Sequence, residues 1–359
     1  MQSNARACWG LILPFLLWVD SPLSADPNQP SESLPTIRPK IPFVSDRPLG
    51  ETVAAIGRQS GLGVLLDPVL AKQIVPFQSQ DLPFWTVLDQ LAAQSDARVV
   101  IREQGRRIEL VPGRSTGGAA RVVGPIRILP TEIRSRLGLQ DTASRYELLL
   151  EVACEPRFPL FRIDSHPRVL RAIASNGKAV QSPATNSRIN LEGATATLTI
   201  PLEGVTREMV RLSEIEAEFR LTAANEWLTF DFTTAKRDGA TPAQAGIALG
   251  MRQSRKQGTA WVIDFDYSRP EGEPAFESFE MQQLAPEWTL IRERDNAAFR
   301  PAERDFTEAG RGYRDRIRFD LEMLQLEAIP TTGWKLQARV SGPIREFPVR
   351  FRLENIPLP

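Results

Sequence analysis

The side chains that most often carry nucleophilic or metal chemistry are scarce in this sequence. It contains one histidine, His166, and two cysteines, Cys8 and Cys154. A site of the Ser-His-Asp or Cys-His type would depend on this one imidazole, and the histidines and cysteines are too few to hold zinc. His166 precedes Pro167 and is expected in a surface loop. Cys154 ends a mostly apolar run and is expected to be buried and inert.

Three aspartates offer another route to chemistry. Asp264 and Asp266 alternate with apolar residues, so they share one face of a predicted strand, while Asp231 belongs to another strand. Carboxylates on one face could bind calcium or act as the acid and base of glycoside hydrolysis. They could equally form the solvated face of half-buried strands. We favour the solvated face, and therefore expect no catalytic, cofactor-binding or metal-binding residues.

Tryptophans could form a platform on which sugars stack. The pattern favours core packing instead, because Trp261 alternates in phase with Ile263 and Phe265 and Trp334 opens a predicted strand. Trp227 and Trp288 receive the same interpretation.

The charge balance gives no support for a nucleic-acid partner. The 359 residues include 44 Lys and Arg against 44 Asp and Glu, whereas phosphate binding needs a surplus of cations. The basic runs 102–107 and 311–318 include acidic residues and are expected on solvated strand faces. Segment 243–250 contains glycines but lacks the lysine of a phosphate-binding loop. We expect no nucleic-acid partner and no cofactor.

Residues 1–25 have the order of a secretory signal. Arg6 supplies positive charge, the run 9–19 contains no ionisable side chain, and small residues end at Ala25. The run is shorter than the roughly 20 residues that span a bilayer, so we expect cleavage, with a retained anchor as the alternative. We expect an exported bacterial protein, periplasmic or extracellular, without an integral membrane span after cleavage.

A small α/β domain is predicted over residues 41–111, after a proline-containing, disordered leader at 26–40. Apolar spacing predicts a helix from Leu49 that ends at Gly61. Asp81 is the expected N-cap of a second helix, and a hairpin turns around 104–105. The predicted order is β-α-β-β-α-β-β.

This order resembles the short N-terminal (STN-like) domain of secretins and TonB-dependent receptors. The resemblance rests on the pattern of apolar positions over residues 41–111, including Gly-Leu-Gly-Val-Leu-Leu-Asp at 61–67 and the helix at 84–94. It implies a docking or signalling module without chemistry of its own. Neither a secretin pore nor a barrel sequence follows, so the family's transport role is not carried over.

The rest of the chain predicts antiparallel β structure after a linker at 112–124. Apolar and polar residues alternate in five stretches, which is typical of half-buried strands; the stretches are 215–221, 228–232, 261–267, 317–323 and 347–353. Similar short motifs recur 118 to 121 residues apart, as in Glu155-Pro156 and Glu273-Pro274. We predict tandem β-sandwiches at 125–238 and 239–359, immunoglobulin-like in architecture only; one larger sandwich is the alternative.

The predicted fold class is mainly β, with a small N-terminal α/β domain and two tandem antiparallel β-sandwiches. The predicted function is that of a non-enzymatic exported envelope protein. Its α/β domain would dock an envelope protein partner, and its sandwiches would act as adhesive or spacer domains. The alternative is a carboxylate-dependent polysaccharide hydrolase or carbohydrate-binding protein that uses Asp231, Asp264 and Asp266.

Overall fold

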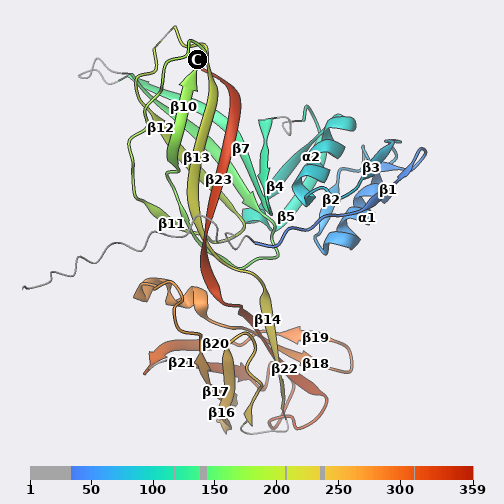
Figure 1. Ribbon diagram of the computed structural model, residues 1–359. Helices are drawn as coiled ribbons and strands as arrows, with labels where there is room; N and C mark the ends of the chain where they lie inside the picture. The colour runs from blue at the N-terminus through green and yellow to red at the C-terminus, as the bar shows by residue number, and fades with distance from the viewer. Residues whose placement is uncertain are drawn as a thin grey trace, which may run out of the picture. The chain divides into compact units, whose positions relative to one another are not determined.

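The computed structural model describes residues 34–115, 119–137, 144–206, 208–234, 239–310 and 312–358. It is mostly β, with a few helices near the N-terminal end of this range (Figure 1), which confirms the predicted fold class. The predicted signal at 1–25 and the leader residues 26–33 lie outside the described residues. Within the described part, no helix combines the length and the apolar character needed to cross a membrane.

The α/β domain has the predicted order of elements. They are β1 (Ile41–Val44), α1 (Leu49–Ser60), β2 (Val64–Leu66), β3 (Phe77–Ser79), α2 (Phe84–Gln94), β4 (Ala97–Arg102) and β5 (Arg107–Pro112). β1 pairs with β3, and a second sheet has the order β2-β5-β4, with β2 parallel to β5. Gly61 ends α1 in the left-handed conformation, at φ 69°, where its N–H donates to Gly57 O.

The expected cap of α2 was wrong. Pro83 occupies the N-cap position and makes no side-chain cap, whereas Asp81 has a positive φ of 57°. The Phe84 N–H at the start of the helix instead donates to the Ile37 carbonyl at 2.9 Å. A segment distant in sequence therefore satisfies a donor that the local pattern assigns to a side-chain cap.

The leader and the linker are more ordered than predicted where the structure describes them. Leu34 is buried in a sandwich core, and Arg157 donates to the Pro35 carbonyl. Residues 121–123 of the predicted linker form β6 (Arg121–Val123), which pairs with the next strand. Proline-rich or glycine-rich composition did not prevent these segments from packing, because neighbouring cores supply the apolar contacts.

The first sandwich packs two antiparallel sheets around one core. One sheet has the order β12-β8-β7-β6; its longer strands are β7 (Ile126–Leu137), β8 (Ser144–Cys154) and β12 (Thr195–Leu202). The other sheet has the order β10-β13-β9-β11, and β23 pairs with the edge of β13 that faces away from β9 and β10. Its strands are β9 (Leu160–Asp164), β10 (Arg168–Ala174), β11 (Arg188–Asn190), β13 (Arg211–Ala224) and β23 (Ile344–Pro357).

The second sandwich also packs two sheets around its own core. One sheet has the order β15-β16-β17-β21-β20, formed by β15 (Gly239–Ala240), β16 (Ala248–Gln257), β17 (Ala260–Ser268), β20 (Glu303–Ala309) and β21 (Gly312–Asp320). The other has the order β14-β22-β18-β19, formed by β14 (Trp227–Thr233), β18 (Glu287–Arg292), β19 (Ala297–Phe299) and β22 (Trp334–Ser341). A 3-10 segment, η3 (Ser278–Leu284), precedes β18.

The two sandwiches exchange a strand with each other. β13 and β14 are consecutive in the chain, as are β22 and β23, yet neither pair forms a hairpin. Instead Ala224 of β13 lies opposite Ile344 of β23, and Trp227 of β14 lies opposite Ser341 of β22. Figure 1 shows β23 beside β13 and β14 beside β22. The sandwiches therefore share strands reciprocally, as in a domain swap within one chain.

This exchange corrects the predicted division at 125–238 and 239–359. β14 precedes residue 239 but belongs to the second sandwich, and β23 follows it but belongs to the first. The predicted inward faces are nevertheless buried: Phe230 and Phe232 pack in the second core, and Phe351 and Leu353 pack in the first. One expected core residue, Met323, is 78% exposed because β21 ends at Asp320.

Candidate functional site

The three aspartates considered for catalysis or calcium binding do not come together. Asp231 lies on β14 in one sheet of the second sandwich, where Lys335 Nζ approaches it at 2.8 Å and Gln337 donates to it at 2.9 Å. Asp264 and Asp266 lie on β17 in the other sheet. Among the described residues, no group of three or more His, Cys, Asp or Glu side chains could hold a metal ion.

Asp264 is held by arginines on both neighbouring strands. It accepts hydrogen bonds from Arg255 and from Arg316, the latter at 2.6 Å. Partial burial opposes ionisation of this carboxyl, but the two arginines outweigh it and hold its pKa below the ordinary value. This outer face of β16, β17 and β21 is therefore a salt-bridged, partly solvated surface, as the alternation indicated.

The other candidate side chains have structural contacts. Cys154 is buried and unpaired, and burial raises the pKa of its thiol. Ser165 Oγ lies 2.9 Å from His166 Nδ1, but it also donates to the Ser187 carbonyl at 3.1 Å. A hydroxyl has one proton, so in that geometry Nδ1–H donates to Oγ and cannot act as its base. Trp261 and Trp288 are buried in the second core, whereas Trp227 and Trp334 are half-buried.

Sequence reasoning missed a buried charge in the second basic run. Asp315 is 1% exposed and accepts a 2.6 Å hydrogen bond from Trp288 Nε1 and a 2.8 Å bond from Arg304 Nε. Burial is the largest influence on this carboxyl and raises its pKa. The signal was present in the sequence, because Asp315 is in phase with the core residues Ile317 and Phe319.

A denser polar network lies on the outer face of the sheet that contains β13. Strand register aligns Arg162, Thr222 and Glu346 on three adjacent strands. Arg188 lies opposite Asp164, whose Oδ2 accepts the Arg220 N–H at 2.9 Å. Alternation therefore brings side chains from β9, β11, β13 and β23 to one face, although Arg162 and Glu346 lie far apart in the sequence.

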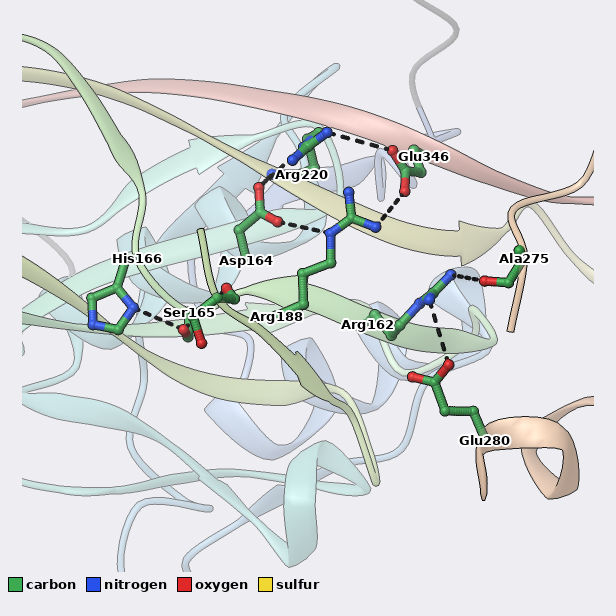
Figure 2. A network of polar contacts seen from close by, with 10 residues as sticks. Arg162, Asp164, Ser165, His166, Arg188, Arg220, Ala275, Glu280 and Glu346 are labelled. Atoms are coloured by element: carbon green, nitrogen blue, oxygen red, sulfur yellow. Dashed lines mark hydrogen bonds and ion pairs between the residues drawn. The ribbon is translucent and has the colours of Figure 1, made fainter. Parts of the chain in front are cut away.

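These side chains are joined by shared ion pairs (Figure 2). Asp164 contacts Arg188 and Arg220 at 3.3 Å each. Glu346 contacts Arg188 at 2.8 Å and Arg220 at 3.9 Å. Two carboxylates and two guanidinium groups thus form a closed ring in which every member has two opposite charges as neighbours. Each side chain is 18–50% exposed, so solvent screens these pairs and each is worth little by itself.

Arg162 is more buried than the four residues of this ring, and it contacts residues of the second sandwich. Its Nη2 donates to the Ala275 carbonyl at 3.0 Å, and its Nη1 reaches Glu280 Oε2 at 3.5 Å. Its guanidinium lies 4.5 Å from the centre of the Phe276 ring. The preceding residue, Phe161, is on a strand of the first sandwich but packs in the second core. β9 therefore ties the two sandwiches together.

A second buried arginine fixes the strand exchange itself. Arg269 binds Glu273 through Nε and Nη2, at 2.6 and 3.0 Å. The same guanidinium donates to the carbonyls of Ser341 and Gly342, at 3.1 and 2.7 Å, in the segment that joins β22 to β23. Glu273 accepts the Ile344 N–H at 2.8 Å. The crossing segment is thus held by charge-assisted hydrogen bonds.

Between these two groups lies a wide, open cleft of about 500 Å³. It is lined by Arg162, Arg188, Gly272, Pro274, Ala275, Ile344, Arg345 and Glu346. The lining combines strands of the first sandwich with a loop of the second, which is why no local sequence pattern indicated it. We define this feature as the junction cleft. It is a candidate binding site because residues of both sandwiches line it, and buried and charged side chains are among them.

Comparison with protein-family models, with curated proteins and with solved structures finds no match. The resemblance of residues 41–111 to the N-terminal domain of secretins therefore stays a prediction.

Proposed function

We propose that this is an exported, non-enzymatic protein of the bacterial envelope. In this proposal the α/β domain docks an envelope protein partner, and the two sandwiches hold it at a fixed distance as a spacer. The export signal read from the sequence supports the location, periplasmic or extracellular. The resemblance of residues 41–111 to a docking module supports the role of the first domain.

The observation that carries the proposal is the distribution of exposed apolar side chains. Nine large apolar residues are exposed among those described, and four of them lie between residues 43 and 74: Phe43, Leu65, Val69 and Ile74. Val69 is 80% exposed and Phe43 57%. Leu65 lies on β2, an edge strand of its sheet. Exposed apolar residues concentrated in one domain, one of them on an edge strand, are typical of a protein-binding surface.

Another part of this domain's surface is already in contact with the first sandwich. Trp85 of α2 donates to the Pro125 carbonyl at 2.9 Å, and the buried Arg127 of β7 pairs with Asp89 of α2 at 3.0 Å. Such contacts fix α2 against the first sandwich. The α/β domain is therefore a rigid attachment, and its remaining surface carries the exposed apolar residues.

The test is site-specific photo-crosslinking in the protein's own bacterium, with a photo-reactive amino acid in place of Val69. We expect one discrete envelope protein to be crosslinked, and the crosslink to be lost when Phe43→Asp is added to the labelled protein. Met323→Asp is the matched control, because Met323 is similarly exposed, at 78%, on the second sandwich. Absence of a crosslinked protein, together with polysaccharide hydrolysis by the purified chain that Asp264→Asn abolishes, would favour the enzymatic alternative instead.

A further inference from the structure

The junction cleft contains a buried cation whose hydrogen bonds are incomplete. Arg162 is 8% exposed, and a guanidinium has five N–H donors in a fixed fork. Its Nε–H is buried and has no hydrogen-bond partner. Its contact with Glu280 is long, at 3.5 Å, and the same Glu280 oxygen also accepts the Glu277 N–H at 2.8 Å. Arg162 therefore has spare donor capacity in a place where unmet donors are costly.

A second guanidinium group lines the cleft beside Arg162. Arg188 of β11 is part of the lining, together with one acid, Glu346. Glu346 is already held by Arg188 and Arg220. A negative group in the cleft would meet the guanidinium groups of Arg162 and Arg188, which come from two strands, β9 and β11.

We propose that the junction cleft binds the carboxylate or phosphate group of a small acidic ligand. Guanidinium groups bind both of these oxyanions through paired, charge-assisted hydrogen bonds. The volume of about 500 Å³ lies within the usual range for small-molecule sites, roughly 300–1,000 Å³, and such sites are frequent where domains meet. The apolar residues Pro274, Ala275 and Ile344 would contact the uncharged part of the ligand.

This inference is independent of the docking role of the α/β domain. All residues that line the cleft lie between 162 and 346, and the exposed apolar residues of the α/β domain lie at 43–74. Loss of partner docking would leave oxyanion binding intact, and the reverse also holds, so the two proposals can fail separately.

The experiment is titration of the mature chain with inorganic phosphate and, separately, with acetate, at constant ionic strength maintained by chloride. Binding is followed by arginine Nε–H NMR signals and by the Tm. We expect saturable shifts of the Arg162 Nε–H signal with at least one probe, at a dissociation constant in the millimolar range or below. A response to phosphate alone, to acetate alone or to both identifies the preferred oxyanion.

Variants assign the effect to the cleft. Arg188→Gln should weaken binding at least fivefold, and its fold should survive because Arg220 still contacts both Asp164 and Glu346. Arg168→Gln is the matched control, since Arg168 pairs with Glu218 on the same sheet face but is 67% exposed and outside the cleft. Unchanged binding in Arg188→Gln, equal weakening in Arg168→Gln, or no saturable shift with either probe would each overturn the proposal.

Discussion

The two sandwiches share a strand plan but differ at the junction. β7, β8 and β12 of the first correspond in order and pairing to β16, β17 and β21 of the second, and β10 and β13 correspond to β18 and β22. β11 joins the sheet of β13, whereas the strand at the same repeat position, β20, joins the opposite sheet beside β21. The segment that forms β9 in the first sandwich is replaced by η3 in the second.

The difference shows how two sandwiches of similar strand order form an interface with each other. Arg162 and Glu280 are 118 residues apart, so they occupy nearly equivalent positions of the two repeats, and they contact each other. The first sandwich has a cation at this position and the second has an anion, so the two matching positions attract each other.

The largest expected effects come from truncating a buried aromatic residue on each of the two exchanged strands. Phe351→Ala should destabilise the first sandwich, and Phe230→Ala the second, each by about 3–5 kcal/mol, because each removes a buried aromatic ring. Tryptophan fluorescence reports mainly on the second sandwich, because four tryptophans lie at 227–334 and the strands of the first sandwich contain none, while Trp85 belongs to α2.

In hydrogen exchange, Phe351→Ala should increase exchange in β8 and β13, and Phe230→Ala in β17 and β22. If Phe351→Ala loosened only the second sandwich, the strand exchange would be refuted, because the residue would then pack within its own repeat.

The alternation of apolar and polar residues predicted which face of each strand is buried, but not with which other strand it pairs. Ile215, Phe219 and Phe351 are buried because period-two alternation is a local property that any sheet partner satisfies. β14 and β23 carry equivalent patterns, so nothing local distinguishes a hairpin from an exchange. The alternating stretches did not include the segment of Arg162, and this residue contacts Ala275 and Glu280, more than 110 residues away.

A smaller effect is expected at the segment that crosses between sandwiches. Arg269→Met should lower the free energy of unfolding by about 3 kcal/mol, because it leaves the Glu273 carboxylate and two carbonyls without their donor. Glu303→Gln is the control: its pair with Arg318 is solvent-exposed and should be worth below about 1 kcal/mol. Chemical denaturation measures both. Equal effects would mean that the crossing segment is held by its strands alone.

The joint between the α/β domain and the first sandwich should be comparably sensitive. Asp89→Asn leaves Arg127, 1% exposed, without its principal counter-charge, while the amide keeps one acceptor. We expect a loss of about 2 kcal/mol, with faster hydrogen exchange in α2 and unchanged exchange in β22. A uniform change throughout the chain would show that the three cores unfold as one unit.

The smallest effect distinguishes two glutamates at matching repeat positions. Glu273 uses both oxygens on Arg269 and Ile344, whereas Glu155 is fully buried, binds Arg157 through Oε2 at 2.7 Å and leaves Oε1 without a partner. Burial is the largest influence on Glu155 and raises its pKa above the ordinary value. The folded state then holds this proton more tightly than the unfolded state, so stability falls as pH rises from about 4.5 through the folded pKa.

Glu155→Gln should remove this decrease in stability with rising pH, because the neutral amide does not ionise. We expect the variant to be more stable than the wild type by about 1 kcal/mol at pH 8, with the difference vanishing near pH 4, where the wild-type carboxyl is protonated in both states. Melting curves between pH 4 and 8 measure this. Glu273→Gln supplies the contrast, since it weakens a charge-assisted contact and should destabilise at pH 8. If both variants were more stable than the wild type, the charges of Glu155 and Glu273 would have the same effect on stability. The segment that joins β22 to β23 would then not depend on the charge of Glu273.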